Sequence, residues 1–118
     1  MADSILFIGW GNPVRGREQK AQDVFQESVE YWGKLQSEGQ IESFQVVFLA
    51  PHGGDLNGFA VFQGEDQKLD AIQHSDEFQR LITRADLIVD SLGVVPGVTG
   101  EELGAQLELG RAQLDELT

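Results

Sequence analysis

The centre of the sequence is the segment IESFQVVFLAPHGGDLNGFAVF, residues 41–62. It contains two runs rich in Phe and Val, residues 41–50 and 59–62, on either side of the turn-forming residues 51–55. Two β-prone runs joined by a turn that contains Pro and Gly are typical of a β-hairpin. We therefore expect two antiparallel strands in the middle of the chain, and the flanking segments decide which fold contains them.

Each flank of this hairpin supplies a strand and a helix. Residues 5–10 are a short apolar run that ends in a Gly-Asn-Pro turn, and residues 17–38 place apolar side chains at the three- and four-residue spacings of an amphipathic helix. After the hairpin, residues 66–85 repeat the helical pattern, with an irregularity at 74–76 that predicts a kink or a restart. Residues 87–92 are expected to be the fourth strand.

The resulting order, βαββαβ, predicts a ferredoxin-like α+β fold, in which an antiparallel four-stranded sheet carries two helices on one face. Residues 93–100 contain Pro and Gly and are expected to be a loop. An extra C-terminal helix is expected over 101–117, because Thr99-Gly100-Glu101-Glu102 has the spacing of a capping box. With 118 residues and no linker, the sequence predicts one domain, 1–118.

The predicted strands are apolar on both faces, as the alternation of Leu6 and Ile8 with Ile5 and Phe7 illustrates. A sheet face of this composition exposed to water is unusual in a soluble monomer. The sequence therefore predicts a homodimer that covers this face. The expected interface set is Phe44, Val46, Phe48, Phe59 and Val61, or the opposite set on the same strands.

The C-terminal helix is the alternative cover for the sheet. Its leucines at 103, 107, 114 and 117, with Gly110 between them, form a narrow apolar seam. Because isolated helices of this length are marginal in water, we expect the seam to be buried, either against the body of the protein or on the partner subunit.

Composition excludes several classes of function. Eight Lys and Arg against twenty Asp and Glu give a formal net charge of −12, so no nucleic acid and no membrane is expected as a partner. Without cysteine and with two histidines, the chain predicts no disulfide, no metal site and no cofactor. The N-terminal residues lack the basic and apolar segments of a signal peptide, so a cytoplasmic protein is expected.

The element order, the two-sided strands and the broken second helix with Ser75-Asp76-Glu77-Phe78-Gln79-Arg80-Leu81 resemble the dimeric α+β barrel superfamily. In that superfamily two ferredoxin-like protomers pack sheet against sheet. The resemblance covers residues 4 to about 98 and is closest to uncharacterised bacterial members. It implies a homodimer but no single activity, because the superfamily includes cofactor-free monooxygenases, haem-degrading enzymes, isomerases, dehalogenating enzymes and stress proteins.

One branch of the superfamily, the haem-degrading enzymes, pairs an Asn on the first strand with a Trp and a His of the second helix. Asn12 and His74 correspond to two of these, and this resemblance makes Asn12 a candidate ligand-binding residue. His74, however, precedes the Ser-Asp-Glu-Phe segment where the family's His follows it, and the third strand has Phe62 and no Trp. Haem degradation is therefore not predicted.

The candidate catalytic residues are Asp90 and His52. Asp90 lies among apolar residues in the predicted strand 87–92 and is a candidate general base if it faces the space between sheet and helices. The alternatives are an ion pair with an Arg such as Arg84, or a strand end in water. His52 lies in the Gly-rich turn, where a titratable ring suits acid/base chemistry but is equally suited to closing the hairpin.

The remaining candidates concern ligand binding. Arg15 and Arg17, with Lys20, lie at a helix N-terminus and predict a site for a carboxylate ligand, unless they pair with surface acids. Trp10, Tyr31 and Trp32 are expected to line a pocket between sheet and helices, and core packing is the alternative for the two tryptophans. The sequence favours a protein that binds or converts a small organic metabolite without a metal ion. It does not decide between an enzyme and a binding protein. The competing interpretation is a non-catalytic module for protein interaction.

Overall fold

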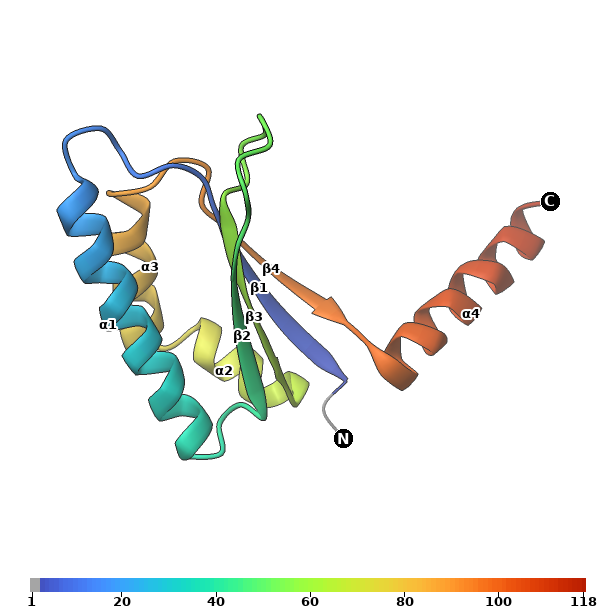
Figure 1. The fold of residues 1–118 in the computed structure, drawn as a ribbon. Coiled ribbons are helices and arrows are strands. Elements are labelled where there is room, and N and C mark those ends of the chain that lie inside the picture. Colours follow the sequence, from blue (N-terminus) through green and yellow to red (C-terminus); the bar gives the residue numbers. More distant parts are fainter. Residues whose placement is uncertain (1–2) are drawn as a thin grey trace.

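The computed structural model describes residues 3–118. Its elements are β1 (Ser4–Trp10), α1 (Glu18–Ser37), β2 (Ser43–Phe48), β3 (Gly58–Gly64), α2 (Asp66–Gln73), α3 (Asp76–Asp86), β4 (Gly93–Val98) and α4 (Gly100–Leu117). The strands form a four-stranded antiparallel sheet in the order β2-β3-β1-β4. Figure 1 shows α1, α2 and α3 on one face of this sheet and α4 beyond the other. This is the predicted ferredoxin-like fold with an additional C-terminal helix.

The core lies between the sheet and its three covering helices. On the central strand β1, Leu6 and Ile8 point toward the helices, as do their pairing partners Phe62 and Ala60 on β3. All four side chains are buried, and Phe62 has no exposed surface. The segment between α1 and β2 contributes Ile41, and the helices contribute the remaining buried members of this core, namely Tyr31, Trp32, Leu35, Leu69, Ile72, Phe78 and Leu81.

The predicted break in the second helix is confirmed, and Ser75 explains it. The Ser75 hydroxyl donates a hydrogen bond of 2.7 Å to the carbonyl oxygen of Ile72, in the last turn of α2. The Ser75 hydroxyl oxygen also accepts a hydrogen bond from the backbone N–H of Phe78 at 3.2 Å and so caps the start of α3. Because one side chain satisfies backbone groups of both helices, the chain ends one helix and starts the next without an intervening loop.

The fourth strand is not where the sequence analysis placed it. Residues 87–92 form a turn, and β4 is Gly93–Val98, the segment predicted to be a loop. Ile88 and Val89 instead pack against Ala21 and Val24 of α1, so their apolar character reflects helix packing and not a strand. Pro96 is compatible with β4 because this strand lies at the edge of the sheet, where a residue without an N–H is tolerated.

The expected interface set is divided between the two faces of the sheet. Phe44 and Val46 pack against the core, and Phe48 lies on their face of β2, so these three belong to the helix side. Phe59 and Val61 point the other way, because they alternate with the buried Ala60 and Phe62. We use the term outer face for the apolar side chains on the side away from α1: Ile5, Phe7, Val47, Phe59, Val61 and Val95.

The C-terminal helix α4 does not pack on the body of the protomer. Every residue from Gly100 to Thr118 is exposed, including the seam leucines, so the predicted burial against the same chain is wrong. Gly100 has a φ of +58°, and a Cβ there would lie 2.7 Å from the Asp3 carboxylate. This left-handed residue turns the chain away from the sheet at the end of β4 (Figure 1). Thr99 precedes the helix, but its side chain makes no capping hydrogen bond.

The core predicts a large difference between two phenylalanines. Replacing Phe62 by Ala should lower the free energy of unfolding by about 3–5 kcal/mol, because the site is closed on all sides and leaves a cavity. Phe48 is 67% exposed, and its replacement by Ala should cost about 1 kcal/mol through lost aromatic contacts. Urea denaturation of both variants measures the difference. Equal losses would contradict this description of the core.

Candidate functional site

A cavity of about 800 Å³ lies between the helix face of the sheet and helices α1 and α3. Its walls come from β1, the end of β2, α1, α3, the loop between β2 and β3 and the turn that follows α3. The apolar side chains that line it are Ile8, Trp10, Pro13, Ala21, Val24, Phe25, Val29, Trp32, Phe48, Phe78, Leu81, Ile82, Ala85, Ile88, Val89 and Leu92. Cavities of this size and composition are typical of small-molecule sites.

Three aromatic rings from three elements meet in the wall of the cavity. Trp10 at the end of β1 lies edge-on to Phe25 of α1, with ring centroids 6.2 Å apart, and to Phe48 of β2, at 6.3 Å. The Phe25 and Phe48 centroids are 5.2 Å apart. Because Phe48 is mostly exposed, this aromatic cluster of Trp10, Phe25 and Phe48 joins the interior of the cavity to its surface.

Polar groups gather at the same end of the sheet, where β1 stops. The backbone N–H of Gly11 donates to the carbonyl of Asp90 at 2.7 Å, and the N–H of Asn57 donates to the carbonyl of Trp10 at 2.8 Å. A Cβ on Gly11 would lie 2.8 Å from the carbonyl oxygens of Asp55 and Asp90, so only glycine lets these two loops approach. The loop after β2 and the turn after α3 thus both close on the end of β1.

An asparagine pair forms part of this polar end. The side-chain amide of Asn57 donates to the side-chain oxygen of Asn12. Asn57 lines the cavity, together with Glu18, Gln22, Gln26 and the hydroxyl-bearing Ser28. The Ser28 hydroxyl already donates to the carbonyl of Val24 at 2.8 Å. The polar part of the lining is therefore mainly amide, and within residues 3–118 Glu18 is the one ionisable side chain in it.

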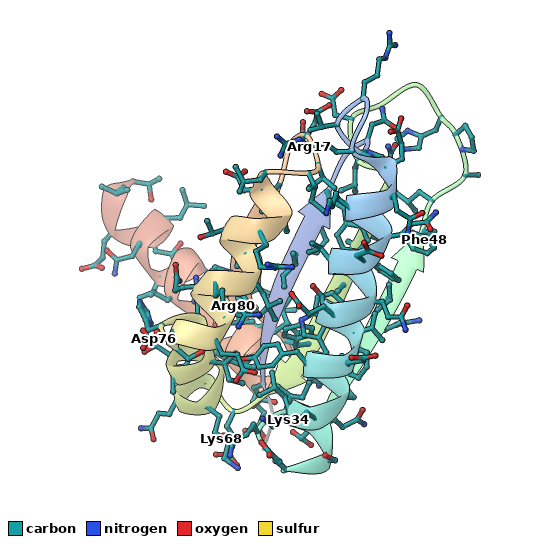
Figure 2. The ribbon with its side chains drawn as sticks, turned by 90° about the vertical axis from the view of Figure 1, so that its left-hand side faces the viewer. Arg17, Lys34, Phe48, Lys68, Asp76 and Arg80 are labelled. Atoms are coloured by element: carbon teal, nitrogen blue, oxygen red, sulfur yellow. The ribbon has the colours of Figure 1, made fainter. Side chains whose placement is uncertain are left out.

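Ion pairs and a hydrogen bond join α1 to α3 and to the residue after it, across the top of the cavity. Glu27 of α1 pairs with Arg84 of α3, with 3.0 Å between Oε1 and Nε, and lies 3.7 Å from Nη2 of Arg80. At the start of α1, the Arg17 guanidinium donates to the carbonyl of Leu87 at 3.1 Å. Figure 2 shows Arg17 where the start of α1 meets the turn after α3, and Arg80 on the side of α3 that faces α1.

The structure places the two candidate catalytic residues outside the cavity lining. Asp90 is exposed in the turn after α3, which matches the alternative of a position in water, although residues 87–92 do not form the expected strand. His52 is exposed in the loop between β2 and β3, where Nε2 lies 2.7 Å from the carbonyl oxygen of Leu56 and Nδ1 accepts from Gly54 at 3.2 Å. These contacts match the alternative noted from the sequence, in which His52 closes the hairpin.

The candidate ligand-binding residues do not come together in one site. Trp10 lines the cavity, and Asn12 contacts its lining through Asn57. Arg15 and Arg17 are exposed near the start of α1 and do not line it. Tyr31 is buried in the core and faces a smaller hollow of about 230 Å³ between α1 and α3. The carboxylate site at the basic residues stays a prediction.

Sequence reasoning missed Phe25, Phe48, Asn57 and Glu18 as parts of the site. Phe25 belongs to the apolar stripe of α1, but the sequence pattern of such a stripe is the same whether its side chains line a cavity or fill a core. Asn57 and Phe48 approach Trp10 only after the β2–β3 loop folds back on β1. Trp10 could be predicted from the sequence because it is a large aromatic residue at the end of the first predicted strand.

Two structural findings concern other kinds of site. None of the helices in residues 3–118 has the length and apolar character of a membrane span. Over the same range, His, Asp and Glu side chains do not gather in groups of three or more that suit a metal ion.

Comparison with known proteins gives the fold but no family assignment. No protein-family model and no curated protein matches the sequence. A dimeric protein of unknown function and ferredoxin-like fold from Bacteroides fragilis NCTC 9343 is 14% identical, with a TM-score of 0.56 over 80% of this chain and 95% of that one. An EthD family protein from Bacillus halodurans C-125 is 12% identical, with a TM-score of 0.64 over 83% and 99%.

An enzyme also has this fold. The hydroxynitrile lyase from Passiflora edulis is 11% identical, with a TM-score of 0.63 over 86% of this chain and 97% of its own. Identities this low establish a shared fold and nothing more. They confirm the ferredoxin-like fold that the element order predicted.

The environment of Tyr31 predicts a measurable titration. Burial raises the pKa of its phenol above 10.0; the hydrogen bond with the Ser75 side chain lowers it, and the nearby carboxylates of Glu77 and Glu38 raise it further. A raised pKa in the folded state means that Tyr31 stabilises the fold below about pH 10, and that this contribution is lost as the pH rises through the folded-state value.

Tyr31 is the single tyrosine of the chain, so tyrosinate absorbance reports on it directly. The titration midpoint should lie above that of the urea-unfolded chain. The difference in stability between wild type and Tyr31→Phe should shrink at alkaline pH. A midpoint equal to or below the unfolded value would contradict the burial of this residue.

Proposed function

We propose that the protein binds a small, mainly apolar organic molecule in the cavity between its sheet and helices, without a metal ion. The observation that carries this proposal is the cavity itself, about 800 Å³ in volume. A core of this chain length is normally filled to the density of an organic crystal, so an apolar space of this size favours a ligand.

The lining indicates the chemical character of that molecule. Its aromatic cluster favours a ring system, and the amides of Asn57, Gln22 and Gln26 suit hydroxyl or carbonyl groups. The carboxylate of Glu18, with no cation in the lining to balance it, disfavours an anionic ligand there. The proposal is for binding, and the fold is compatible with catalysis because the hydroxynitrile lyase shares it.

A homodimer is the second part of the proposal. The outer face carries Phe7 stacked on Phe59, with centroids 5.3 Å apart, and Val95 with 54% of its surface exposed. A second copy of the sheet would cover this apolar face. The dimeric state of the similar protein from Bacteroides fragilis supports this arrangement.

The alternative function is a non-catalytic module for protein interaction. The observation that favours it is that every residue of α4 is exposed, its leucines included. The two functions differ in where a partner binds, since a ligand occupies the cavity and an interaction module uses α4 or the outer face.

Blocking the cavity tests the proposed function. Both tryptophans line the cavity, so a bound aromatic compound should quench their fluorescence. We expect 1-naphthol or a related neutral aromatic compound to do so and, at a hundred times its Kd, to stabilise the fold by about 2.7 kcal/mol. Ala85→Phe fills the cavity and should remove both effects.

Thr83→Phe provides a matched control, because Thr83 is exposed on the same helix and does not line the cavity. It should bind as wild type does. A panel of neutral aromatic compounds that leaves the melting temperature and the fluorescence of the wild-type protein unchanged would refute the proposal, as would equal binding by Ala85→Phe.

The dimer is tested by a charge on the outer face. Val61→Glu should convert a dimer into a monomer in light scattering at micromolar concentration, because two carboxylates would be buried in the interface. Thr83→Glu adds the same charge on α3 and should leave the mass unchanged. A wild-type protein that is itself monomeric under these conditions would exclude the interface.

A further inference from the structure

The exposed helix α4 has the sequence pattern of a coiled-coil helix. Its seam positions are 103, 107, 110, 114 and 117, separated by four, three, four and three residues. This spacing averages about 3.5 residues, the period that keeps one stripe facing a partner helix along a supercoil. In heptad notation Leu107 and Leu114 occupy position a, and Leu103, Gly110 and Leu117 occupy position d.

The width of the stripe indicates what kind of surface it meets. A helix that covers a sheet or a globular core normally carries a third apolar position beside a and d. In α4 the flanking e and g positions hold Gly104, Gln106, Arg111 and Gln113. The fifth leucine, Leu109, is at the outer position c and lies off the seam. An a/d stripe with no apolar side chain at e or g is the seam of a helix that packs against one other helix.

The charges of α4 permit that other helix to be identical. All of its acidic residues are at the outer positions b and c: Glu101, Glu102, Glu108, Asp115 and Glu116. The flanking cation Arg111 is paired within the helix, where its guanidinium contacts the Glu108 carboxylate. Two copies can therefore meet along the seam without opposing carboxylates, although the whole chain carries a net charge of −12.

The seam is accessible in the protomer. Leu107 and Leu114 are 67% and 63% exposed. A Cβ added to Gly110 would have no atom within 4 Å other than those of adjacent residues and of the helix's own backbone. Figure 1 shows α4 standing away from the sheet along its length. Glycine at position d lets two backbones approach closely at the middle of the helix.

We propose that α4 pairs through this seam with α4 of a second copy of the chain. This contact is separate from the outer face of the sheet and does not depend on a ligand in the cavity. It explains why four of the five leucines of an otherwise acidic helix are arranged on a heptad seam that no part of residues 3–118 covers.

Cysteine cross-linking tests the pairing, because the chain has no cysteine of its own. Gly110→Cys places a thiol at the middle of the seam, within reach of its equivalent whether the helices run parallel or antiparallel. At roughly 0.1 mM protein, a concentration chosen because short helices pair weakly, a short bismaleimide should join two copies. Ala112→Cys, on the outer side of α4, should give at least about fivefold less linked product.

A second pair of variants checks that the seam is responsible. Adding Leu107→Glu and Leu114→Glu to Gly110→Cys should abolish the linked product. The matched control is Ala105→Glu with Leu109→Glu, which adds the same charge off the seam; Leu109 is 61% exposed, like the seam leucines. This control should retain the product.

Three outcomes would overturn the proposal: no linked product from Gly110→Cys, equal yields from positions 110 and 112, or a yield that the seam charges leave unchanged. The first is expected if α4 docks on the body of another subunit or on a different protein. Circular dichroism of each variant verifies that the sheet remains folded. None of these outcomes bears on ligand binding in the cavity.

Discussion

The position of β1 between two antiparallel neighbours is the constraint on which the rest of the structure depends. Hydrogen bonding to β3 on one side and β4 on the other fixes which way each β1 side chain points. Leu6 and Ile8 then belong to the core, and Ile5 and Phe7 belong to the outer face. A shift of one residue would exchange these sets, so the core, the cavity wall at Trp10 and the outer face share a single register.

The cavity follows from how the helices are held above this sheet. Large side chains at the far end of α1, such as Trp32 packing on Phe62 and Phe44, fill the space between helix and sheet. Nearer the start of α1, smaller residues such as Ala21 and Ser28 line the cavity. The ion pairs of Glu27 with α3 and the Arg17 contact with Leu87 join the two helices over this space, and a partly open apolar cavity remains between the helices and the sheet.

Two apolar surfaces lie outside the core, and they differ in kind. The outer face is broad and made of β-branched and aromatic side chains, which suits contact with another sheet. The seam of α4 is narrow and flanked by polar residues, which suits another helix. The chain is strongly acidic, yet the seam of α4 carries no carboxylate, because all the acidic residues of this helix are at its outer positions.

The sequence by itself determined the hairpin, the covering helices, the break at Ser75 and the two-sided strands, because these depend on local spacing and capping within a few residues. It misplaced β4 for two reasons. Ile88 and Val89 are apolar because they pack against α1, and Pro96 fits in a strand because β4 lies at the edge of the sheet. Neither the helix contact nor the edge position can be read from the sequence. Of the site, it predicted Trp10 and a pocket between sheet and helices. Phe25, Phe48 and Asn57 join Trp10 only through tertiary contacts between distant segments, and the exposure of Asp90 and His52 likewise depends on loops that close on the end of β1.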